Sequence, residues 1–190
     1  MVSGKTLGMV STLPVVAAVC RDGNHGFSKL MCDRIDLVAG FGVEGDAHAG
    51  NTVQHLSRVH EDAEQPNLRQ VHLIQAELFD DLSEKGFTLS PGDLGENITT
   101  RSIGLLGLSR DTLLRVGDSA VLRVTGLRNP CAQIEAFAPG LLKYVVEKTD
   151  GATIRKAGIM AIVVEGGPVM PGDPIISIGP AGPHIPLERV

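Results

Sequence analysis

Eight short apolar runs, each bounded by Gly, Pro, Asp or Asn, constrain the fold of this chain more than any other feature. They are rich in Val, Ile and Leu, and they are too short for typical helices. That length and composition are typical of β-strands. The predicted strands are Val15–Val19, Ile35–Ala39, Val71–Ile74, Asn97–Thr100, Leu113–Val116, Ala120–Thr125, Ile159–Val164 and Ile175–Ile178.

Two segments carry helical signals instead. In Gln75–Lys85 the apolar residues share one face, acidic residues fill the rest, and a glycine follows. A second helix is predicted over Leu141–Lys148, ahead of an Asp-Gly turn. Many short strands with two or more short inserted helices predict a mainly β fold, a β-rich α+β domain. We expect its sheet to form a closed or nearly closed β-barrel, because closure removes exposed strand edges.

Size and composition narrow the possible functions. With 190 residues, the chain is predicted to be one domain, 1–190, with its motifs in about 27–178 and a tail at 179–190. A net charge of −5 and an aromatic share of 3% argue against a nucleic-acid binder. No apolar run approaches the ~20 residues of a membrane span. Three scattered cysteines do not suggest a disulfide framework, which favours a cytoplasmic location.

A long polar segment, residues 40–67, is rich in glycine and histidine. Loops of this length inside a compact domain are usually functional or disordered. The segment contains Asp46, His48, His55 and His60, with His72 just after its end, and these side chains are possible ligands for zinc or iron. Their spacing does not match the H-E-x-x-H pattern of a metal-binding helix. A histidine-loop metallohydrolase therefore stays open as an alternative function.

Cys131 follows Asn129-Pro130 in a loop that is predicted to lead into a helix. A thiol at such a junction lies near unpaired amide groups, and Arg128 adds positive charge, which favours the thiolate. A thiolate is a soft ligand, suited to a soft or redox-active metal. Cysteine is also among the most buried residue types, so a small buried apolar side chain is the other interpretation. The sequence alone leaves both open.

Six basic residues are candidates for binding an anionic ligand. Several lie directly before or after a predicted strand, so they would meet at one mouth of a barrel, while the others are expected to be ordinary surface residues. The candidates are Lys29, Arg69, Arg101, Arg128, Arg155 and Lys156.

Eight motifs occur along the chain in a fixed order. They are Phe27-Ser28-Lys29, Gly42–Gly50, Arg69–Ile74, Pro91–Thr99, Asn129-Pro130-Cys131, Arg155–Ile159, Glu165-Gly166-Gly167 and Pro171-Gly172-Asp173. In this order and spacing the chain resembles the MOSC domain, the module shared by the C-terminal part of molybdenum-cofactor sulfurases and several small molybdenum-cofactor proteins.

The resemblance implies a barrel of the pyruvate-kinase-barrel type that binds molybdenum cofactor, a pterin phosphate whose dithiolene holds the metal. Cys131 would be the protein ligand to molybdenum, or the acceptor of cofactor-bound sulfur. Asp46 and His48 would lie at the same mouth and deliver protons. The remaining cofactor-binding residues implied by the resemblance are Lys29, Arg69, Asn97, Thr99, Arg128, Asn129 and Lys156.

By analogy with its relatives, the chain is expected to be the catalytic subunit of a reductase of N-hydroxylated or N-oxygenated compounds. It contains no iron–sulfur cysteine cluster, so a separate flavin or iron–sulfur protein would donate the electrons. Pyridoxal phosphate is not expected to bind this chain. The alternative is a non-catalytic carrier of cofactor or sulfur, with a cofactor sulfurase or a recipient enzyme as partner. The sequence makes no prediction of the oligomeric state.

Overall fold

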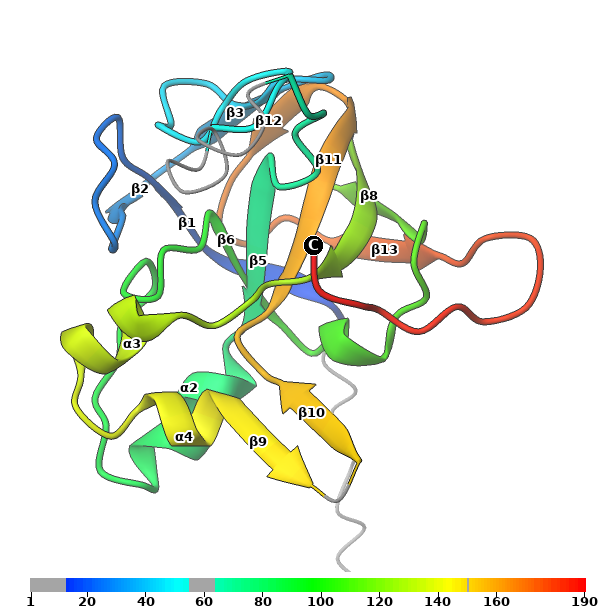
Figure 1. The fold of residues 1–190 in the computed structure, drawn as a ribbon. Coiled ribbons are helices and arrows are strands. Elements are labelled where there is room, and N and C mark those ends of the chain that lie inside the picture. Colours follow the sequence, from blue (N-terminus) through cyan, green and yellow to red (C-terminus); the bar gives the residue numbers. More distant parts are fainter. Residues whose placement is uncertain (1–12, 55–63, 150) are drawn as a thin grey trace, which may run out of the picture.

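The computed structural model describes residues 13–54, 64–149 and 151–190, and β-strands dominate it (Figure 1). The largest sheet has eight strands in the order β13-β7-β8-β11-β5-β6-β1-β2. Neighbouring strands are antiparallel except β5 and β6, which run parallel. The strands are β1 (Val15–Arg21), β2 (Leu30–Cys32), β5 (Val71–Gln75), β6 (Ile98–Arg101), β7 (Leu113–Val116), β8 (Ala120–Leu127), β11 (Ile159–Glu165) and β13 (Ile175–Ile178).

Two smaller sheets and a few short helices complete the described fold. One sheet joins β12 (Gly167–Val169), β3 (Ile35–Val38) and β4 (Gly42–Val43), and the other pairs β9 (Val146–Thr149) with β10 (Ala152–Arg155). The helices are α2 (Glu77–Ser83), α3 (Ala132–Phe137), α4 (Leu142–Val145) and the 3₁₀ turn η1 (Leu105–Gly107). Within the described ranges, no helix has the length and apolar character that crossing a membrane requires.

All eight predicted strands are present, with ends within two residues of those predicted. The first predicted helix is also present as the shorter α2. The prediction of a helix over Leu141–Lys148 was wrong in its second half, because α4 ends at Val145 and β9 begins at Val146. Residues of β9 pair in register with β10 across the turn. Hairpin pairing thus overrides the local helical signal.

No described sheet closes into a barrel, so the prediction of full closure was wrong, while the mainly β fold is confirmed. The outer edge of β1 is divided between two partners. Its C-terminal residues pair with β2, whereas its start makes an isolated bridge, Val15 to Pro174, and a few backbone hydrogen bonds with the segment just before β13. Since proline has no N–H to donate, a regular ladder cannot continue through it.

Strand β5 separates the two clusters of the hydrophobic core. Leu73 belongs to the larger cluster inside the main sheet, and its neighbour Ile74 belongs to a smaller cluster packed against α2, α3 and α4. Successive side chains of a strand point to opposite faces. His72 therefore shares the face of Ile74, on the side of the helices.

Candidate functional site

A cavity of about 280 Å³ lies where six segments of the chain meet. The segments are the β1–β2 loop with Phe27, the loop after β4 with His48, strand β5 with His72, the turn at Gly95, the loop between β8 and α3 with Cys131, and strand β11 with Met160. These segments are far apart in the sequence, so the site exists only in the folded chain.

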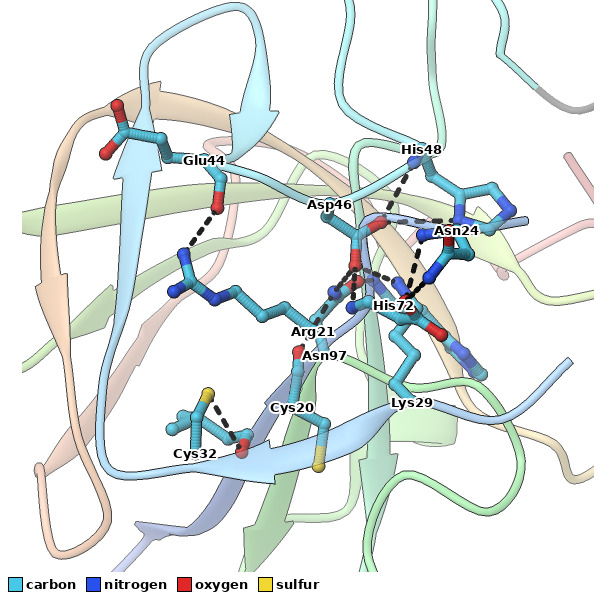
Figure 2. A network of polar contacts seen from close by, with 12 residues as sticks. Cys20, Arg21, Asn24, Lys29, Cys32, Glu44, Asp46, His48, His72 and Asn97 are labelled. Carbon is cyan, nitrogen blue, oxygen red and sulfur yellow. Dashed lines mark hydrogen bonds and ion pairs between the residues drawn. The ribbon is translucent and has the colours of Figure 1, made fainter. Parts of the chain in front are cut away.

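A buried carboxylate, that of Asp46, organises one side of the cavity (Figure 2). Its Oδ2 accepts hydrogen bonds from Lys29 Nζ at 2.6 Å and from Asn97 Nδ2 at 2.9 Å. The side chains of Lys29 and Asp46 are only 3% and 1% exposed. Burial opposes ionisation of Asp46, but hydrogen bonds from His48 and the charge of Lys29 outweigh it and hold the pKa of the carboxyl well below its usual range. Asp46 is therefore an ionised anchor.

His48 is held by the other oxygen of the same carboxylate. Its backbone N–H donates to Asp46 Oδ1 at 2.9 Å, and its Nδ1 lies 3.3 Å from that oxygen. The His48 side chain is 30% exposed and lines the cavity, with the ring of His25 at 5.7 Å between centroids. An oriented, partly exposed imidazole is suited to moving protons between solvent and a bound ligand.

The backbone around Lys29 is fixed by a glycine that no other residue can replace without strain. Lys29 N–H donates to the Gly92 carbonyl at 2.9 Å, and Gly92 has a φ of +92°. A Cβ at Gly92 would collide with the Lys29 carbonyl oxygen. The turn at Gly92-Asp93, within the motif Pro91–Thr99, thus helps to place the ammonium of Lys29 in the cavity wall.

Arg128 is a buried cation with an unsatisfied nitrogen. Only 8% of the residue is exposed, it lines the cavity, and its Nη1 has no hydrogen-bond partner within the described structure. Its guanidinium carbon lies 5.8 Å from the centroid of the Phe27 ring, which is also 5.5 Å from the ring of Phe137. Phe27 therefore holds the guanidinium in place from one side and packs against α3 on the other.

We expect Phe27→Leu to weaken the binding of sulfate, a simple test anion, by about 2–30-fold, because the cation–π contact that orients Arg128 is worth about 0.5–2 kcal/mol. The measurement is isothermal titration with each protein. Phe87→Leu is the matched control, since Phe87 also belongs to an aromatic pair, with Tyr144, but does not line the cavity. Equal sulfate affinity in the two variants would contradict the orienting role of Phe27.

Cys131 is a half-buried residue at the cavity wall, so the interpretation as a small buried apolar side chain was wrong. It precedes α3 directly, as the predicted loop-to-helix junction requires, although this helix has only six residues. Its Sγ donates to Gln133 Oε1 at 3.4 Å. Cys20 differs, because it is fully buried and burial raises the pKa of its thiol to about 12. Cys131 is thus the accessible thiol of the site.

The structure brings most of the predicted site residues to the cavity, but not all. The predicted residues that line it are Lys29, His48, Arg69, Arg128, Asn129 and Cys131. Asp46 and Asn97 lie directly behind Lys29. The Thr99 hydroxyl is buried and donates to Glu96 Oε1 at 3.0 Å, and Lys156 pairs with Glu147 at 2.8 Å. Neither lines the cavity.

Other predicted candidates also lie elsewhere. Arg101 forms an exposed ion pair with Asp80. Arg155 does not line the cavity, but its Nε donates to Asn129 Oδ1 at 3.4 Å and so fixes a residue that does. His55 and His60 lie outside the described residues, and among the described ones no group of three or more His, Cys, Asp or Glu side chains could hold a metal ion.

His72 was predicted only as a possible metal ligand at the end of the polar loop, and not as a residue of the cofactor site. His72 is the one polar residue in the apolar run of β5, which is the signal that could have identified it. It is 4% exposed and lines the cavity, and its Nε2 lies 2.8 Å from the Ala157 carbonyl oxygen. Burial, together with the charge of Arg128, holds the pKa of this ring well below its usual range. His72 is therefore neutral at neutral pH.

Comparison with known proteins identifies both a family and a shared fold. The family model described as MOSC domain matches residues 45–176. Among solved structures, the YuaD protein from Bacillus subtilis is 22% identical with a TM-score of 0.70, covering 86% of this chain and 94% of that one. YiiM from Geobacillus stearothermophilus is 17% identical with a TM-score of 0.64, covering 90% and 77%. No curated protein matches the chain.

Proposed function

Because the chain belongs to the MOSC domain family, a family associated with molybdenum cofactor, we propose that its cavity binds this cofactor with Cys131 as the protein ligand to the metal. The charge of the wall is the observation that carries the proposal. Lys29, Arg69 and Arg128 line the cavity, and no carboxylate is among its described lining residues. In a chain of net charge −5, such a wall favours an anionic ligand.

The residues present fit a pterin phosphate that carries a soft metal. The buried Nη1 of Arg128 lacks a partner, and a phosphate oxygen would satisfy it with a charge-assisted hydrogen bond. The thiol of Cys131 suits a soft metal. Asn129 and Gln133 add amide groups to the same wall, which can bind the polar edge of a pterin. The volume of about 280 Å³ is near the lower end of usual ligand sites.

Asp46 and Asn97 have supporting roles. With Asn97 and Asp46 behind it, the Lys29 ammonium is held at the wall, where it can attract an anion. Since the pKa of Asp46 is low, this carboxylate is a poor proton donor and acts by orienting Lys29 and His48. Thr99 would not contact the ligand. Its hydroxyl donates to Glu96 and so supports the turn before β6.

The reaction we propose is reduction of N-hydroxylated or N-oxygenated compounds with electrons from a separate flavin or iron–sulfur protein. When bound, the cofactor would supply the redox-active metal that accepts the oxygen of the substrate. Release of this oxygen as water requires two protons, and His48 is the partly exposed imidazole that we assign to deliver them. Asp46 keeps the His48 ring oriented through the hydrogen bonds at Oδ1.

A carrier of cofactor or sulfur is the second candidate, and the partial exposure of Cys131 favours it, because a partner protein could reach this sulfur. Reconstitution distinguishes the two. The chain is loaded with released molybdenum cofactor, desalted, and supplied with an amidoxime and a chemically reduced dye. Retained pterin with formation of the amidine supports the reductase, and retained pterin without turnover supports the carrier. Failure to retain pterin would contradict both.

A further inference from the structure

We propose that His72 takes up a proton from solvent when an anion occupies the cavity, so that an imidazolium then stands beside the bound group. The proposal rests on the proposed function, because it requires an anion in this cavity. It adds a second proton-holding side chain to the site, one that is buried and charged only in the occupied state.

The backbone around the ring is arranged for a charged imidazole. A carbonyl can only accept, so the 2.8 Å contact with Ala157 requires that Nε2 carries a hydrogen in the neutral ring. Gly95 also lines the cavity, and its backbone favours the charged form of the ring. A neutral ring has one N–H, which Ala157 already accepts at Nε2, so a second proton would be added at the other ring nitrogen, Nδ1.

The groups around the His72 ring explain why the ring is neutral, without a second proton, when no anion is bound. Burial disfavours the charged ring most, followed by the positive charges of Arg128, after β8, and Lys29, before β2. On β11 the residue paired with His72 is Met160, which carries no charge, and on the β6 side Asn97 Oδ1 accepts the His72 backbone N–H. No described carboxylate lines the cavity, and the buried carboxyls behind its wall act on the cations instead: Asp46 pairs with Lys29, and Glu96 favours the charged form of Arg128.

An anion bound at the cavity wall would favour the charged form of the His72 ring over the neutral form. It neutralises Arg128, whose unpartnered Nη1 it would bind, and it places a negative charge near the ring. Uptake of a proton by His72 then strengthens the binding of the anion, because the proton and the anion each raise the affinity of the protein for the other. His48 and His25 differ from His72 because they are not buried, so that water already screens their charge.

Sulfate is the probe for the test, because it takes up no proton itself near neutral pH. Titration of the full-length protein with sulfate, in buffers of different ionisation enthalpy, counts the protons taken up. We expect up to one proton per sulfate, with the dissociation constant rising by up to about tenfold for each pH unit between about pH 5.5 and 7.5. Nitrogen NMR of the histidine rings in the wild-type protein should show His72 becoming doubly protonated as sulfate is added.

His72→Gln is the decisive variant, because glutamine can still donate to the Ala157 carbonyl but cannot be protonated. It is expected to bind sulfate with the proton uptake lost, whereas His184→Gln, at an exposed histidine that does not line the cavity, should retain it. Wild-type binding without proton uptake, or uptake unchanged in His72→Gln, would overturn the proposal, and the NMR result decides if the variant does not fold. Failure of the wild type to bind sulfate would instead overturn the anionic site of the proposed function, and this proposal with it.

Discussion

Replacing Asp46 with alanine is expected to lower the free energy of unfolding by about 3–5 kcal/mol, the usual loss when one partner of a buried ion pair is removed. The reason is that the ammonium of Lys29, with 3% of its side chain exposed, would remain buried without its counter-charge. The Asn97 amide and the backbone of His48 would lose their acceptor in the same change. Urea denaturation at pH 7 measures the effect.

Asp36→Ala is the matched control, because it removes the same charge from an exposed ion pair with Arg34. Exposed pairs contribute about 0–1 kcal/mol, so the two variants should differ several-fold in their loss of stability. Equal losses would show that the Asp46 network does not hold the site together.

The pH dependence of stability follows from the low pKa of Asp46. A carboxyl whose pKa is lowered by folding stabilises the protein above its unfolded value, here 3.8, and this contribution is lost as the pH falls from there through the folded value. Asp46→Asn should therefore be less stable than wild type by a constant amount from pH 5 to 7, and this difference should shrink below about pH 4. A difference that grows below pH 4 would contradict the ionised anchor.

The second large effect is expected at Arg128. We predict that Arg128→Met weakens sulfate binding by about 10–150-fold, because a hydrogen bond to a charged group is worth about 1.5–3 kcal/mol. Stability should change little or rise, since the substitution removes a buried nitrogen that has no partner. Titration with sulfate and urea denaturation on the same samples measure both quantities.

Arg155→Met is the control for that experiment. Arg155 touches the same loop through Asn129 but does not line the cavity, so its sulfate affinity should stay within about threefold of wild type. A comparable loss in both variants would mean that positive charge in this region, and not the placement of Arg128, determines anion binding.

The strands and part of the site could be predicted from the sequence because their signals are local. The apolar composition of a run such as Leu113–Val116 predicts a strand, and the motif around Cys131 predicts a loop before a helix. The failures concern long-range pairing. Whether the sheet closes depends on how β1 meets the segment before β13, and the division of Leu141–Lys148 depends on the partner strand β10.

For the site, the sequence identified residue types but not the direction of their side chains. Lys156 and Arg128 are both basic residues next to strands, yet Glu147 binds the first at the surface and the cavity holds the second. His72 was not predicted as part of the cofactor site because a histidine in an apolar strand is normally part of the core, and only the fold places Arg128 and the cavity beside it.

The molybdenum content of the purified chain tests the proposed cofactor site most directly. Wild type, Cys131→Ser and Cys32→Ser are produced with molybdate in a host that makes the cofactor, and their metals are determined by elemental analysis. Cys32 is the control because it is a free thiol that does not line the cavity. We predict molybdenum in wild type and Cys32→Ser and its loss in Cys131→Ser. Equal molybdenum in all three, or none in the wild type, would contradict a cofactor anchored by Cys131.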